Sequence, residues 1–281
     1  MSFTPTTEYL VPKLKLETLL AILGRGVRLN GRRLDEYRPI SIITDYIPNA
    51  DGSALVKLGN TQVLVGIKLE VGTPYPDTPN DGNLIINAEF MPTASPIFEP
   101  GPPDENAIEL ARVIDRGIRE SRAVDLSKLA LIPGKRVWNL WVDIYVLDHD
   151  GNLIDASSMG VLAALSTTKV PKAEIKENNE VVIDKTVRTS QLSINKYVTT
   201  VTVAKIGEHL LVDPDLEEES LMDAKLIVSV TDDGLIAGLQ KSGPGYFTEE
   251  ELMKAISIGL NKGKELIDII KGSVQASPQV V

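Results

Sequence analysis

The order of short β-rich runs and longer helical patterns constrains the fold of this chain most strongly. The runs are expected at Ile40–Thr44, Ser53–Leu58, Thr61–Leu69, Leu84–Met91, Arg136–Leu147, Thr199–Ile206, Leu210–Val212, Lys225–Thr231 and Leu235–Gln240. Turn dipeptides such as Asp51-Gly52 and Gly59-Asn60 separate the first of them, which is typical of β-hairpins. Strands precede helices in both halves of the chain. We therefore expect an α+β architecture of two similar β-then-α lobes.

Apolar residues at helical spacing indicate four helices. They are expected at Pro12–Arg25, Glu105–Ala123, Ile154–Thr168 and Thr248–Ile270. The charged, aperiodic stretch Lys172–Asn179 is the expected junction between the lobes. The expected segments are an N-terminal tail and helix at 1–27, a first domain at 28–170, a connecting segment at 171–198, a second domain at 199–271 and a disordered tail at 272–281.

Composition excludes several classes of function. The chain has no cysteine and two histidines, so cysteine-rich zinc sites and multi-histidine metal centres are not expected. The net charge of −10 argues against a uniformly basic, nucleic-acid-binding surface. No apolar run approaches the ~20 residues that span a bilayer, and Met1–Glu8 lacks the features of a secretory signal. We expect a cytoplasmic protein with no membrane contact and no cofactor. The acidic loop Asp213–Asp223 could bind a cation, but a solvated loop without a metal is the preferred interpretation.

Four stretches in register resemble the ribonuclease PH family. They are Asn30–Ile40, Asp51–Val56 with Gly59–Thr61, Val146–Asn152 and Leu211–Pro214. One departure is Asn30, where the family usually has aspartate before Gly-Arg. The resemblance implies a ribonuclease PH-like fold, whose N-terminal lobe is similar to ribosomal protein S5 domain 2.

Within that family, Phe98–Asn106 and the Asp213-Pro214 pair make the chain most similar to the larger, catalytically inert ring subunit of the archaeal exosome. The resemblance implies a hexameric ring of three heterodimers with a catalytic ribonuclease PH-type subunit. RNA-binding cap subunits would complete a machine that degrades single-stranded RNA from 3′ to 5′ by phosphorolysis.

The catalytic groups of active relatives are altered in this chain. Active members place a Ser-Arg phosphate-binding turn where this chain has Gly151–Asp155, without arginine and with an added carboxylate. Asp155 either faces that turn, where it would repel phosphate, or caps the following helix. Of the two aspartates that active members need, Asp213 matches the first. The second position falls near Ala224, one residue from Asp223, and a shift of one residue along a strand reverses the side-chain direction.

The acidic protein still offers one basic stripe on a helix. Arg112, Arg116 and Arg119 lie at i, i+4 and i+7, and Arg122 lies one position off the stripe. The resemblance implies that the three stripe arginines lean across the subunit interface toward RNA near the partner's active site. Arginine suits this contact because its planar fork pairs with phosphate in bidentate fashion.

Two alternatives concern the basic residues. The stripe arginines can instead pair with Asp115, Glu109 or Glu120 on a solvated surface. The second basic concentration, Gly24–Arg38, is expected to fix the entry of the chain and a subunit contact rather than to bind RNA.

Three functions follow from these features. The first is a non-catalytic scaffold subunit that completes a partner's active site and guides RNA. The second is an autonomous phosphorolytic exoribonuclease that uses the acidic loop between Asp213 and Asp223. The third is a generic RNA-binding module, which would be monomeric and would bind RNA with substantial affinity by itself.

Overall fold

The computed structural model describes residues 13–176 and 181–276. The first sheet has the order β1-β2-β3-β6-β4, and β5 pairs with β6 outside this path. Its strands are β1 (Ile40–Thr44), β2 (Gly52–Leu58), β3 (Thr61–Gly72), β4 (Asn83–Phe90), β5 (Ala130–Ile132) and β6 (Arg136–Asp148). β4 runs parallel to β6, and the other pairings are antiparallel. The expected strands of the first lobe are therefore confirmed, while β5 was not expected.

The second sheet is antiparallel, with the order β10-β9-β11-β12. Its strands are β9 (Val198–Ile206), β10 (His209–Val212), β11 (Ala224–Thr231) and β12 (Ile236–Ser242). β9 is buried along its whole length because both of its faces are covered, whereas β12 is an outer strand with alternating exposure. The β-rich runs of the second lobe thus form a sheet of their own, as the α+β expectation requires.

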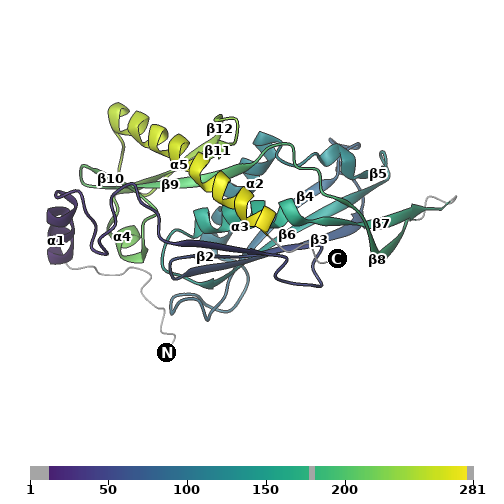
Figure 1. Cartoon of the computed structure of the whole chain (residues 1–281), viewed down its shortest axis with the longest axis horizontal. Coiled ribbons are helices and arrows are strands. Elements are labelled where there is room, and N and C mark those ends of the chain that lie inside the picture. Colours follow the sequence, from purple (N-terminus) through teal and green to yellow (C-terminus); the bar gives the residue numbers. More distant parts are fainter. Residues whose placement is uncertain (1–12, 177–180, 277–281) are drawn as a thin grey trace.

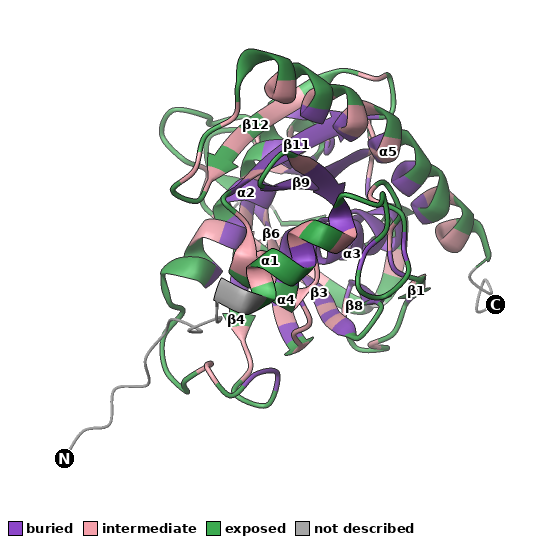
Figure 2. Cartoon of the chain, turned by 90° about the vertical axis from the view of Figure 1, so that its left-hand side faces the viewer, coloured by how far each residue is buried: buried purple, intermediate pink, exposed green. Residues whose placement is uncertain are grey.

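The helices join the two sheets into one core. They are α1 (Lys13–Leu23), α2 (Glu105–Ser121), α3 (Leu153–Thr167), α4 (Leu216–Leu221) and α5 (Glu249–Ala276), with a short 3-10 turn at Leu126–Leu129. α3 packs against β2 and β3 of the first sheet and β9 of the second, α2 against β4 and β12, and α5 against β9 and β11 (Figure 1). In Figure 2, β9 and β11 are buried while α5 alternates between buried and exposed residues.

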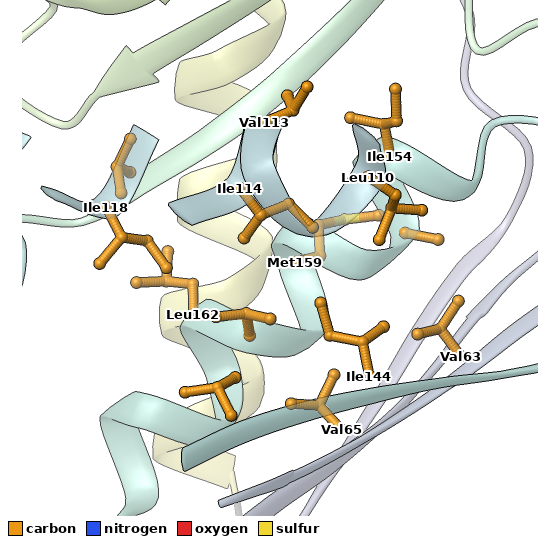
Figure 3. Packing of buried hydrophobic residues seen from close by; sticks show 14 of the residues in the cluster. Val63, Val65, Leu110, Val113, Ile114, Ile118, Ile144, Ile154, Met159 and Leu162 are labelled. Carbon is orange, nitrogen blue, oxygen red and sulfur yellow. The ribbon is translucent and has the colours of Figure 1, made fainter. Parts of the chain in front are cut away.

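The central helix α3 lies in the core because it is apolar on all sides and rich in small residues. A Cβ on Gly160 would lie 2.9 Å from Val65 Cγ2, so glycine permits the close approach to β3. Figure 3 shows Met159 and Leu162 of α3 facing Ile114 of α2 and Ile144 of β6. Leu162 is 1% exposed, so Leu162→Ala would cost about 2–5 kcal/mol of stability.

Two segments contain more regular structure than the sequence indicated. The connecting segment 171–198 contains most of an antiparallel hairpin of β7 (Lys169–Ile175) and β8 (Val181–Gln191). The β-branched residues of β8 outweigh its charges, and Arg188 pairs with the buried Asp51 at the base of the hairpin. Figure 1 shows this hairpin projecting from the body.

The tail expected to be disordered from residue 272 begins instead as helix, since α5 continues to Ala276 and Val274 packs against the core. Residues 277–281, and residues 1–12 of the expected N-terminal tail, lie outside the described residues. The domain boundaries expected at 28, 171, 199 and 272 stay predictions. None of the helices in residues 13–176 and 181–276 combines the length and apolar composition that crossing a bilayer requires.

Candidate nucleic-acid interface and catalytic position

The turn that would hold phosphate in active relatives is closed in this chain. Gly151 follows β6 with φ +84°, and Asn152 at the start of α3 has φ +54°. A Cβ on Gly151 would lie 2.5–2.7 Å from backbone atoms of Pro214, Asp215 and Leu216. The turn is therefore packed directly beneath the chain that enters α4, and Asn152 is only 1% exposed. Residues 214–216 therefore cover the side of the turn to which a Cβ on Gly151 would point.

Asp213, the expected match to the first catalytic aspartate, is committed to internal contacts. Its carboxylate accepts hydrogen bonds from Nε and Nη2 of Arg38 at 2.9 and 2.7 Å, from Arg32 Nη1 at 2.8 Å and from Asn152 Nδ2 at 2.9 Å. The backbone N–H of Arg38 donates a further bond of 2.8 Å. Burial by itself would raise the pKa of Asp213, but the hydrogen bonds and charge of Arg38 outweigh burial and lower it.

Asp155 is fully buried and lies across the same turn from Asp213. The Nδ2 atom of Asn152 donates to both carboxylates, at 2.9 Å to each. Tyr37 Oη and the side chains of Thr200 and Thr202 also donate to Asp155, as does the backbone N–H of Thr202. Burial raises the pKa of Asp155 to about 6 although these hydrogen bonds favour the charged form.

The hydrogen bonds of Asp155 run to β9, to Tyr37 and to the side-chain amide of Asn152, which contradicts the alternative that Asp155 caps α3. The other alternative, that Asp155 repels phosphate at this turn, stays a prediction. Two carboxylates, Asp155 and Asp213, flank the start of α3, where a helix would otherwise attract an anion. The helix terminus is therefore occupied by the protein's own negative charge.

Asp213 and Asp223 lie apart along the second sheet, and the loss of the acidic pair of active relatives stays a prediction. Asp213 follows Val212, which pairs with Val203 of β9, whereas Asp223 precedes Ala224, which pairs with Lys205 of β9. At about 3.3 Å per residue, that register separates the two aspartates by roughly 13 Å along the sheet. Asp223 is exposed and accepts a hydrogen bond of 2.7 Å from Gly207 N. The described part of the chain contains no group of three or more His, Asp and Glu side chains that could hold a metal ion.

The basic segment Gly24–Arg38 was expected to fix the entry of the chain, and its buried arginines do hold it to the second lobe, through acidic partners that the sequence did not specify. Arg28 is 2% exposed, and it pairs with Glu218 and donates to the backbone oxygens of Val212 and Asp213 at 2.7 and 2.8 Å. Arg32 also pairs with Asp213. The acidic loop expected at 213–223 contains α4, which begins with a capping box between Asp215 and Glu218. The Asp-x-x-Glu spacing carried that signal.

The arginine stripe divides into open and tied residues. α2 is N-capped by Asp104 and ends at Arg122, whose φ is +52°. Arg112 and Arg116 are exposed, and neither makes an ion pair or hydrogen bond with a described residue. Arg119 instead donates to Asp115 at 2.7 Å and to the Leu84 oxygen at 3.1 Å. The alternative in which the stripe arginines pair with acidic residues is therefore correct for Arg119 but not for Arg112 or Arg116.

The remaining carboxylates near the stripe do not neutralise it. Glu109 accepts a hydrogen bond of 2.7 Å from Gln240 of β12, which fixes it toward the second sheet. Glu120 has no ion pair or hydrogen bond within residues 13–176 and 181–276. The stripe therefore presents to solvent two guanidinium groups without a partner among the described residues, and such groups can contact phosphate.

The two sheets and the helices packed between them form the two-lobed α+β architecture that the ribonuclease PH resemblance implies. The chain matches the 3′ exoribonuclease family, domain 1, over residues 36–171 and domain 2 of the same family over residues 196–262. It therefore belongs to the ribonuclease PH-type 3′ exoribonuclease family, as the sequence resemblance indicated.

Relatives and solved structures extend this likeness along most of the chain. The chain is 52% identical over 274 residues to a protein of Sulfurisphaera tokodaii named exosome complex component Rrp42, covering 98% of this chain and 99% of that one. A solved chain from an Archaeoglobus fulgidus exosome with RNA bound to the active site is 45% identical, with a TM-score of 0.82 and coverage of 92% and 98%. A chain of an archaeal exosome core is 42% identical, with a TM-score of 0.79 and coverage of 92% and 97%.

Proposed function

We propose that this chain is a non-catalytic ring subunit of an archaeal-type exosome, which degrades RNA from 3′ to 5′ by phosphorolysis in the cytoplasm. The observation that carries the proposal is the closed turn at Gly151, where Asp213 is neutralised by two buried arginines. Phosphorolysis requires an open position for inorganic phosphate beside RNA and groups that stabilise developing charge. A carboxylate-filled, buried turn provides neither.

The relatives support a role in a multi-subunit ring. The Rrp42 name belongs to a protein that matches almost end to end, and the two solved neighbours are chains of exosome assemblies. In the proposed ring, three copies alternate with three catalytic ribonuclease PH-type subunits, and RNA-binding cap subunits cover one face. The autonomous exoribonuclease is not favoured, because Asp213 and Asp223 are separated by the strand register.

An uncovered strand edge supports assembly with a partner. β12 is the last strand of its sheet, and Leu235, Ile236 and Leu239 are 59%, 41% and 44% exposed. An edge with unpaired backbone groups and exposed apolar side chains is a template for pairing with another chain. α2 packs against β12, so a partner on this edge would lie next to Arg112 and Arg116.

The proposed role of Arg112, Arg116 and Arg119 is to hold RNA phosphates near the partner's active site. The two open arginines are the principal contacts, and Arg119 contributes less because Asp115 already neutralises it. An exposed stripe of this kind adds affinity without base specificity. The generic RNA-binding module is disfavoured, since two free guanidinium groups on an acidic chain do not supply substantial affinity alone.

Reconstitution tests the scaffold role. Phosphorolysis of single-stranded RNA is measured for the catalytic subunit of the same ring, alone and after assembly with this chain. We expect the assembled ring to release nucleoside diphosphates at least tenfold faster than the catalytic subunit alone. Equal rates with and without this chain would contradict the proposal.

A charge-reversal pair tests the RNA contact. Arg112→Glu with Arg116→Glu should weaken RNA binding by the assembled ring and leave assembly intact, because both side chains are exposed. Size-exclusion chromatography checks assembly, and RNA affinity is measured over a salt series. The matched control is Lys254→Glu with Lys264→Glu on α5, which reverses two exposed charges away from α2 and should leave RNA affinity within twofold. Unchanged affinity of the α2 variant at every salt concentration would remove the stripe from the RNA path.

A further inference from the structure

A hollow outside the closed turn lies at the start of α2. About 610 Å³ of space lies between the end of β4, the loop at 92–104 and the first turn of α2. A second space of about 230 Å³ shares Phe90, Ile97 and Phe98 with it and extends to His149 and Lys225. We call the two together the acidic hollow. The larger space lies within the range of about 300–1,000 Å³ that is typical of ligand sites, and the smaller space adds to it.

The hollow is lined by more negative than positive charge. Its carboxylates are Glu89, Glu99, Asp104, Glu109 and Glu219, and its one ammonium group belongs to Lys225. Lys225 lies 3.7 Å from Glu219 and is thereby already paired. Glu89 and Glu99 are exposed, and neither has an ion pair or hydrogen bond with any residue in the described ranges. Two carboxylates at the larger space thus lack a cationic partner.

Aromatic rings and prolines form the walls. The ring centroids of Phe90 and Phe98 are 4.7 Å apart, and Phe98 stacks on His149 at 5.3 Å. Burial lowers the pKa of His149, so the imidazole adds no positive charge at neutral pH. Aromatic faces attract cations, and apolar walls pack against the aliphatic stems of lysine and arginine.

We infer that the acidic hollow binds a Lys- or Arg-bearing segment of another polypeptide chain. A cationic head group would pair with Glu89 and Glu99, while its stem would pack on Phe90, Phe98 and the prolines of the 92–104 loop. Charge complementarity selects this occupant over RNA, because phosphates would meet unpaired carboxylates and no free cation in the lining. The hollow and the open arginines of α2 would therefore receive ligands of opposite charge. The inference holds whether or not the chain is a ring subunit.

Fluorescence anisotropy with a defined peptide tests the inference on the full chain. The probe is fluorescein-labelled Gly-Pro-Arg-Gly-Lys-Pro-Gly, and its counterpart carries citrulline and acetyl-lysine in place of the two charged residues. At low salt we expect saturable binding of the basic peptide, at least tenfold tighter than that of the neutral one. Glu89→Gln with Glu99→Gln should weaken it at least fivefold.

A matched variant separates the hollow from the overall negative charge. Glu249→Gln with Glu250→Gln removes two exposed carboxylates at the start of α5 and should change peptide affinity less than twofold. Equal weakening by both double variants, or no preference for the basic peptide, overturns the inference. Competition with a labelled ten-nucleotide RNA gives a third possible outcome. If the peptide displaces this RNA from the wild-type chain, and if Phe98→Leu weakens RNA binding, the hollow binds RNA instead. Because none of these readings uses phosphorolysis, their failure leaves the proposed ring function standing.

Discussion

Arginine side chains are buried and paired in one region of this molecule and exposed and unpaired in another. Around Asp213, the guanidinium groups of Arg28, Arg32 and Arg38 are buried and face carboxylates of the same chain. On α2, Arg112 and Arg116 are exposed and face solvent without a partner among the described residues. The first group holds the fold together, and the second remains available to a polyanion.

The contrast shows that basic residues near a family's catalytic position need not bind substrate. A buried arginine requires a carboxylate, because removal of one partner leaves an uncompensated charge in the interior. Once Asp213 and Glu218 meet that requirement, neither the acids nor the cations remain free for a metal ion or phosphate. An exposed arginine keeps its hydration until RNA arrives, and so retains its binding capacity.

The largest expected effect is on the buried side of this comparison. Asp213→Ala leaves Arg38 and Arg32 without their main counter-charge and should lower the free energy of unfolding by about 3–5 kcal/mol. Urea-induced unfolding followed by circular dichroism measures the change. Glu217→Ala is the control, since it breaks only the exposed pair with Lys15 and should cost less than about 1 kcal/mol. Equal losses would mean that the Asp213 network is solvated.

Asp155 should give the buried region a distinctive dependence on pH. Its pKa is raised to about 6 in the folded chain, so the unfolded chain releases this proton first as pH rises. The contribution of Asp155 to stability should therefore be largest below about pH 4, fall between pH 4 and 6, and level off above. Relative to Asp155→Asn, the wild type should lose about 3 kcal/mol across that window.

A surface carboxyl provides the opposite sign as a control. The hydrogen bond from Lys196 lowers the pKa of Asp233 to about 2, so its contribution to stability should be lost only as pH falls below about 4. Unfolding free energies of the wild type, Asp155→Asn and Asp233→Asn at several pH values give the two difference curves. If the difference in unfolding free energy between the wild type and Asp155→Asn did not change between pH 4 and 6, the pKa of Asp155 would not be raised by burial.

On the open side, Arg116→Ala should weaken RNA binding by the assembled ring about tenfold, which corresponds to about 1.4 kcal/mol. The slope of log affinity against log salt should fall by about 0.7, as expected for one phosphate contact to a single strand. Filter binding between 50 and 300 mM salt measures both. Stability should hardly change, because Arg116 is exposed and makes no ion pair or hydrogen bond with a described residue. A loss of affinity with an unchanged salt slope would point to a packing effect instead.

Arg119→Ala should produce the smallest effect on RNA. Its guanidinium already binds Asp115 and the Leu84 oxygen, so its removal should change RNA affinity less than threefold. The same titration, run beside Arg116→Ala, makes the comparison direct. If Arg119→Ala weakened binding as much as Arg116→Ala, the division of the stripe into open and tied residues would fail.

The strands and main helices could be predicted because their patterns are local. Apolar periodicity and turn dipeptides placed α2, α3 and nine strands within a few residues of their bounds. The hairpin of β7 and β8 was missed because charged residues interrupt its β-branched residues, so that no clear strand pattern is visible. It is also stabilised by the pair of Arg188 with Asp51, which is far away in sequence. The end of α5 was missed because Gly272 resembles a helix stop, while the contact of Val274 with the core is tertiary.

The candidate site was predictable only in part. Substitution at Gly151–Asp155 and the shifted acid at Asp223 were visible in the sequence. The closure of the turn was not, because it depends on Pro214 and Leu216 lying against Gly151 across more than sixty residues of chain. The pairing of Arg28 and Arg38 with acids beyond residue 210 is equally remote.

Turnover by the isolated chain tests the central claim most directly. The purified chain is incubated with end-labelled single-stranded RNA, inorganic phosphate and Mg²⁺, and released nucleoside diphosphate is counted. With Gly151 covered by residues 214–216 and Asp213 bound by arginines, we expect no release above the protein-free blank. Sustained, phosphate-dependent release that is abolished by Asp213→Asn would contradict the account.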